Sequence, residues 1–182
     1  MTTPIKYFPM PQFTPIWNGD DWICTLALPA WKPFLHSDDS GQIEVVLVTE
    51  DEGEKARPTE LQLTALGHIH DNQSELFSVM EAALRKFYTE VHPSYAQYVE
   101  EPESVLPDNP DAAQFAAMHE LQCIFVHPVA VQGLAYVGFS FRALWEMEHG
   151  IGILTHDRRI VAAGGADTAF LTWIAEKDAA ER

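Results

Sequence analysis

A strict two-residue alternation near residue 140 constrains the fold more than any other feature of the sequence. Apolar side chains occupy every second position from Ala135 to Trp145, and most of the positions between them are polar or small. Because successive side chains of a strand point to opposite faces, this period predicts a strand with one face in a core. Such a strand needs hydrogen-bonded neighbours, so the chain is expected to build a sheet.

The sequence around this strand predicts a β-meander in the C-terminal third. Glu148-His149-Gly150 is expected to form a tight turn, and Asp157-Arg158 a second one. Leu121 to Val126 is apolar on both faces, which is typical of a central strand covered on both sides. The strands expected in this way cover residues 22–28, 43–49, 121–126, 135–145, 151–156 and 159–162.

Two helices are predicted between these strands, and a third after them. Thr59-Glu-Leu-Gln62 has capping-box spacing and opens the first helix. The second begins near Ser74, carries an apolar stripe, and is expected to end at His92 because Pro93 disfavours a helical residue before it. The third is expected after Gly164-Gly165, with Asp167 as its N-cap.

Together these elements predict an α+β domain. We expect an antiparallel sheet with a C-terminal β-meander, and with the two central helices and the C-terminal helix packed on one face. Residues 1–182 form a single domain in this prediction, in which 1–20 is an extended, Pro-rich segment and 100–111 an acidic, Pro-rich loop.

The charge balance limits the partners of this chain. It has 11 Lys and Arg against 27 Asp and Glu, a formal net charge of −16. Nucleic acid and anionic membranes are therefore not expected as partners, because binding phosphate needs clustered cations. The sequence has no secretory signal and no run of about 18 apolar residues, so we expect a soluble, cytoplasmic protein.

Many of the carboxylates gather in two stretches without Lys or Arg, which we expect to be solvated loops. The first stretch contains Asp38, Asp39, Glu44, Glu50, Asp51, Glu52 and Glu54, and the second contains Glu100, Glu101, Glu103, Asp108 and Asp111. Clustered carboxylates suit a basic protein partner, since they speed its association. The alternative is that they serve solubility alone.

The hairpin from Trp145 to His156 carries the densest set of reactive side chains. Glu146, Glu148, His149 and His156 are a conceivable set of ligands for one divalent metal ion. The alternative is an ordinary polar turn, since no recognised ligand spacing is present. Asp167 is a further candidate residue, although Gly164-Gly-Ala-Asp167 lacks the features of a phosphate loop and fits a helix cap better.

Nucleophilic catalysis has weaker support. Ser140 lacks the second glycine of a nucleophile elbow, and it is expected in mid-strand. Cys24 and Cys123 stand in apolar stretches and are expected to be buried thiols, although the sequence leaves open whether they are close in space. Aromatic residues near the N-terminus, among them Trp17, Trp22, Trp31 and Phe34, could form an exposed binding surface or wrap a face of the sheet.

The C-terminal third resembles a family of bacterial domains of unknown function. The resemblance rests on Ala135-Tyr-Val-Gly-Phe-Ser-Phe, on Trp145-x-x-Glu-His-Gly-x-Gly-x-Leu-Thr-His156, and on Gly164-Gly-Ala-Asp-Thr-Ala-Phe170 with Trp173. Some members of this kind resemble immunity proteins that accompany contact-delivered polymorphic toxins. The resemblance implies a small bacterial protein and assigns no catalytic residues.

These observations favour a non-enzymatic protein-binding module without a cofactor. We expect it to be of the immunity type, with an acidic surface that meets a basic, toxin-like partner. The alternative is a metal-dependent hydrolase that uses Glu146, Glu148, His149 and His156 around one divalent ion.

Overall fold

The structure is a computed structural model, and it describes residues 13–36, 41–49, 57–98 and 105–182. This part of the chain forms a seven-stranded sheet whose strands follow the order of the sequence. They are β1 (Ile16–Trp17), β2 (Trp22–Ala27), β3 (Gln42–Leu47), β4 (His119–Val131), β5 (Leu134–Ala143), β6 (Glu146–His156) and β7 (Arg159–Gly164). Neighbouring strands are antiparallel except β3 and β4, which are parallel.

Helices connect and cover this sheet, and the predicted α+β class is confirmed. They are η1 (Pro29–Phe34), α1 (Glu60–Asp71), α2 (Gln73–Tyr95), α4 (Ala112–Ala117), η2 (Ala166–Ala169) and α5 (Thr172–Ala180). The connection from β3 to β4 includes α1, α2 and α4, because parallel neighbours need a long crossover. Among the described helices, none is long and apolar enough to cross a membrane.

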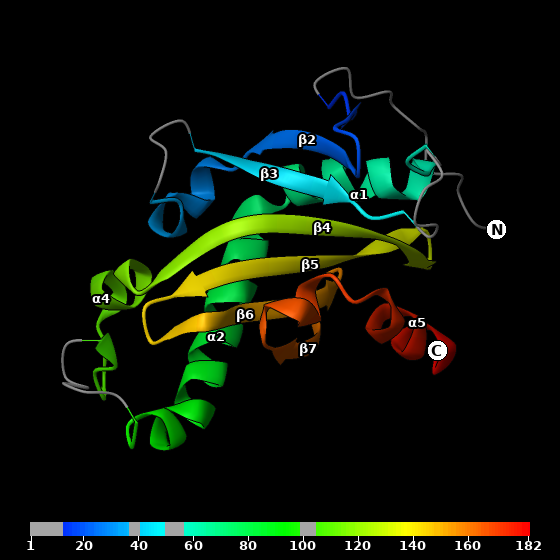
Figure 1. Cartoon of the computed structure of the whole chain (residues 1–182). Coiled ribbons are helices and arrows are strands. Elements are labelled where there is room, and N and C mark those ends of the chain that lie inside the picture. The colour runs from blue at the N-terminus through cyan, green and yellow to red at the C-terminus, as the bar shows by residue number, and fades with distance from the viewer. Residues whose placement is uncertain (1–12, 37–40, 50–56, 99–104) are drawn as a thin grey trace.

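The helices lie on both faces of the sheet, so the prediction that all three would share one face needs correction. In Figure 1, α1 and α2 lie behind the sheet, while η2 and α5 lie in front of it. Val137 and Phe139 of β5 belong to the main core, whereas Tyr136 packs in a second, smaller cluster with Ala175 of α5. Adjacent residues of a strand face opposite sides, which places α5 opposite the other two helices.

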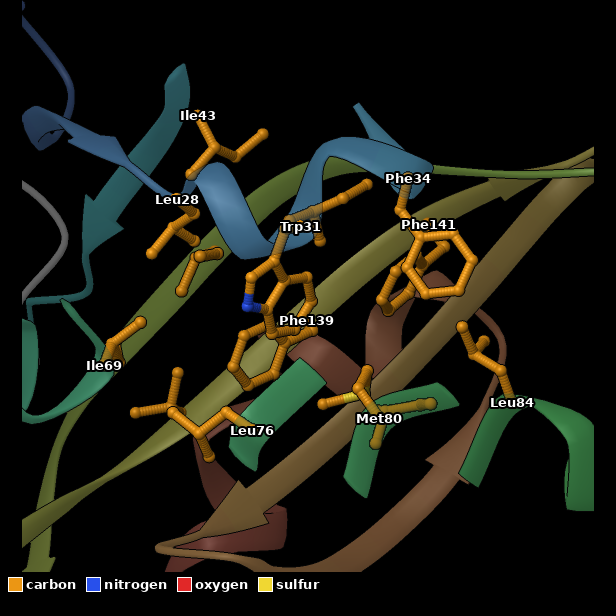
Figure 2. Close-up of a cluster of buried hydrophobic side chains, with 14 of the residues drawn as sticks. Leu28, Trp31, Phe34, Ile43, Ile69, Leu76, Met80, Leu84, Phe139 and Phe141 are labelled. Carbon is orange, nitrogen blue, oxygen red and sulfur yellow. The ribbon is translucent and has the colours of Figure 1, made fainter. Parts of the chain in front are cut away.

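Trp31 stands at the centre of the main core (Figure 2). It has no exposed surface, and its ring stacks on that of Phe139 with centroids 5.2 Å apart. Its indole N–H donates to the backbone oxygen of Gln73 at 3.0 Å. Phe34 is also buried, so neither residue belongs to an exposed aromatic surface. Trp17 and Trp22 contact each other edge to face.

Several boundaries differ from the sequence prediction. The β5–β6 turn lies at Leu144 and Trp145, so Glu148 to Gly150 lie within β6 and do not form the turn. Helix α2 continues past Pro93 to Tyr95. A proline this close to a helix end removes little backbone hydrogen bonding, and the contact of Tyr95 with Trp145 favours the extra turn.

The glycine-rich segment after β7 also differs from its prediction. Asp167 lies inside the short helix η2 and does not cap α5, whose N-cap is Leu171. The expected capping box of Thr59 and Gln62 is confirmed. Gln62 in addition donates through Nε2 to the carbonyls of Val48 and Val126, at 2.8 and 2.9 Å. This one side chain therefore ties α1 to the ends of the parallel strands.

His119 is a fully buried polar residue at the start of β4. Its Nδ1–H donates to the carbonyl of Phe115 at 2.8 Å, and its Nε2 accepts from the indole N–H of Trp145 at 3.2 Å. Both ring nitrogens are thus satisfied by a neutral imidazole. Burial lowers the pKa of His119 to about 4.

The free energy of unfolding should therefore fall as the pH drops. The unfolded chain binds a proton at His119 near pH 6.5, while the folded state resists it until about pH 4. The stability that depends on neutral His119 is present above pH 6.5 and decreases by about 3 kcal/mol between pH 6.5 and 4. Urea unfolding at a series of pH values measures this slope.

The variant His119→Gln provides the control for that slope, because an amide does not titrate in this range. The pKa of the buried His127 is also lowered, so both residues contribute to the pH dependence of the wild-type free energy of unfolding. The difference between the wild type and His119→Gln isolates His119. Identical slopes for the two proteins would contradict the assignment.

Candidate functional site: an open face of the sheet

One row of apolar residues crosses all seven strands on a single face of the sheet. Each member is the direct cross-strand partner of the next, so the members lie side by side on one face. The row is Ile16, Ile23, Val46, Phe125, Gly138, Leu154 and Ala162. The same face carries Tyr136 and therefore faces away from α1 and α2.

The half of this row on β5 to β7 is covered by the chain itself. A Cβ atom on Gly138 would lie 1.8 Å from the carbonyl oxygen of Ala169, so η2 rests directly on the strand backbone. A Cβ atom on Gly152, on the adjacent strand, would likewise meet the backbone of Gly165 and of η2 at 2.5 to 2.7 Å. Leu154 and Ala162 pack against α5.

His127 links η2 and α5, which cover this half of the row, to the sheet. Its Nε2 donates to the carbonyl of Ala169 at 2.9 Å, and its Nδ1 accepts from the hydroxyl of Thr172 at 3.2 Å. The imidazole is fully buried and therefore neutral. His127 thus joins β4 to both η2 and α5.

The other half of the row is open, and we call it the open row: Ile16, Ile23, Val46 and Phe125. In the part of the chain that the structure describes, no helix lies over the front of β2 and β3 (Figure 1). Ile16 is 59% exposed, and the other three members are half-buried. Phe170, 43% exposed, contacts Phe125 with ring centroids 5.5 Å apart and marks the edge of the covered half.

Carboxylates flank the open row. Glu44 lies two residues before Val46 on the same face, and Asp21 directly precedes β2. Burial and, to a smaller extent, the negative charges of Glu44 and Asp21 raise the pKa of the Cys123 thiol to about 12, which places both charges near this face. Among the described residues, neither carboxylate pairs with Lys or Arg.

The two cysteines lie on opposite faces of the sheet. Cys24 pairs with Val45, which pairs with Ile124, the neighbour of Cys123. Cys24 faces the main core, where burial raises its pKa to about 11. The two thiols are two strands apart and point in opposite directions, so they are not placed for a disulfide.

The predicted hairpin residues separate into two places. Glu146 is held near one end of β6, where its Oε1 accepts from the backbone N–H and Nδ1 of His149 at 3.1 and 3.2 Å. Tyr95 donates its hydroxyl to Oε2 of the same carboxylate. Burial raises the pKa of Glu146, but these hydrogen bonds outweigh it and hold the pKa below its usual range.

His156 lies at the far end of the same strand. It lies ten positions after Glu146, which corresponds to about 30 Å in a strand. Its Nε2 donates to the carbonyls of Val131 and Leu134 and so closes the β4–β5 turn. Glu148 and Asp167 are exposed, and Trp145 is buried in the core.

The four candidate ligands therefore do not surround one ion. Across residues 13–36, 41–49, 57–98 and 105–182, no group of three or more His, Cys, Asp or Glu is arranged to hold a metal. The hydrolase alternative loses its proposed ligand set on this geometry.

The whole of the predicted acidic surface lies outside the described residues. This applies to Asp38, Asp39, Glu50, Asp51, Glu52, Glu54, Glu100, Glu101 and Glu103. Three further carboxylates of the two acidic stretches are described, and they are exposed: Glu44, Asp108 and Asp111. Asp111 forms a capping box with Gln114 and so begins α4, a helix that was not predicted from the sequence.

Comparison with protein-family models matches residues 20–171 to the family described as Domain of unknown function (DUF6985). The chain belongs to this family. The expected membership of a family of domains of unknown function is thereby confirmed. Comparisons with curated proteins and with solved structures gave no match.

The DUF6985 match contains most of the candidate site. It runs from just before β2 to just after η2, so it includes Ile23, Val46 and Phe125 together with the glycine contacts of η2. Helix α5 and Ile16 lie beyond it. Within this chain, Gly138 and Gly152 of the recognised pattern have a structural role, because they let η2 approach the sheet.

Proposed function

We propose that this DUF6985 protein is a non-enzymatic protein-binding module that uses its open row to bind a basic partner. The observation that carries the proposal is an apolar cross-strand row, covered by the chain on β5 to β7 and, among the residues that the structure describes, open on β1 to β4. An apolar face of a sheet is normally covered by a second layer of secondary structure. An exposed apolar patch with polar surroundings is typical of a protein interaction site.

Charge supports a basic partner. The net charge is −16, and Glu44 and Asp21 flank the open row without a Lys or Arg partner in the described residues. A cationic protein would be steered to such a surface and would pair with these carboxylates at the rim of the interface. The resemblance to immunity proteins suggests the kind of partner, a basic toxin that binding would neutralise.

Replacing Val46 with lysine tests this function. The variant places a cation in the middle of the open row, so it should repel a basic partner and leave an unpaired charge at the interface. We expect affinity capture from the cells that make the protein to retain a basic protein on the wild type. Val46→Lys should retain at least tenfold less of it, and raising the salt concentration should release it.

Ala82→Lys is the matched control, because it adds the same charge at an exposed position in α2 on the other side of the sheet. It should retain the partner as well as the wild type does. If no basic protein is captured, or if both variants retain it equally, the proposed function is wrong.

A further inference from the structure

The open half of the sheet has the width of one α-helix. From β1 to β4 there are three strand spacings, which is about 14 Å at about 4.8 Å each. A helix with its side chains is about 10 to 12 Å across. The open row therefore offers room for a single helix and not for two.

On the covered half, a helix packs on the sheet through its apolar side chains. There, α5 places Ile174 and Ala175 against Tyr136 and Leu154, so one apolar stripe of a helix covers one side of the row. Phe170, just before α5, contacts Phe125, the last member of the open row. A helix on the open row would continue the layer that η2 and α5 begin, with Phe170 at the junction.

We infer that the occupant of the open row is one amphipathic helix of the basic partner, with its apolar stripe on the four residues of the open row. This inference rests on the proposed function. Its charge requirement follows from Asp21 and Glu44, which flank Ile23 and Val46 and lack a cationic partner in the described residues. Lys or Arg residues beside the stripe would pair with these carboxylates.

Three synthetic peptides of equal composition test the inference. The first is an 18-residue Leu/Lys peptide with leucine at i, i+3, i+4 and i+7, which forms an amphipathic helix. The second is a scrambled version without a stripe, and the third alternates Leu and Lys and forms strands. Fluorescence anisotropy of the labelled peptides with the full chain measures their affinities at low and at high salt.

We expect the helical peptide to bind at least tenfold more tightly than the other two. Val46→Lys and Ile16→Lys should each lower the affinity for the helical peptide at least tenfold, whereas Ala82→Lys should change this affinity less than twofold. Ile16 is 59% exposed, so its substitution keeps the test valid even if Val46→Lys impairs folding.

Two results would overturn the inference, and they are distinguishable. If all three peptides bind equally and both row variants still weaken them, the helix is wrong while the proposed binding surface stands. If the row variants weaken the binding of no peptide more than Ala82→Lys does, both the inference and the proposed function are wrong.

Discussion

Replacing Gly138 with alanine should lower the free energy of unfolding by about 3 kcal/mol. The new Cβ would lie 1.8 Å from the carbonyl oxygen of Ala169, and the carbonyl carbon and Cα of Ala169 are within 2.8 Å. Because these atoms belong to the backbone, no side-chain rotation relieves the clash. Helix η2 must move away from β5, which also strains the hydrogen bond from His127 to Ala169. Urea unfolding measures the loss.

Gly165→Ala is the control for this prediction. Gly165 has φ −60°, which any residue adopts, and its added Cβ would meet only the side-chain oxygen of Asp167 at 3.2 Å. The exposed Asp167 side chain can turn aside, so we expect a change within about 0.5 kcal/mol. Equal losses for the two variants would show that η2 does not rest on the sheet as described.

Replacing Trp31 with alanine should have the other large effect, a loss of about 4 kcal/mol. The indole is fully buried between Phe139 and Phe77, and its N–H satisfies the carbonyl of Gln73. The substitution leaves a cavity in the core and a backbone acceptor without its donor. Chemical denaturation measures the change in stability.

Trp173→Ala is the matched control for Trp31→Ala. Trp173 lies in the first turn of α5 and is 56% exposed, so its removal should change stability by less than about 1 kcal/mol. A Trp31→Ala variant as stable as Trp173→Ala would contradict the described core.

Local patterns predicted much of this fold from the sequence. The alternation around Phe139 predicted β5, and the spacing of Thr59 and Gln62 predicted the start of α1. These features depend on neighbours along the chain, which a sequence displays directly. The side of the sheet that α5 covers was not predictable in this way. It depends on Gly138 and Gly152, whose missing side chains matter only once η2 is folded over them.

The candidate site was harder to predict for the same reason. Ile16, Ile23, Val46 and Phe125 come from four strands, and they form a row only through the strand register. One signal was present in the sequence: Trp22, Ile23 and Cys24 are apolar on both faces of β2, which indicates a strand that is covered on both sides. Conversely, Glu146 and His156 are close in sequence yet lie at opposite ends of one strand.

Photo-cross-linking in the cells that make the protein tests directly whether the open row binds a basic protein. A photoreactive phenylalanine at position 46 stands in the open row, and the same residue at position 82 stands on the exposed side of α2. We expect a covalent adduct with a basic protein from position 46 and none from position 82. No adduct at position 46, or the same adduct from both positions, would contradict it.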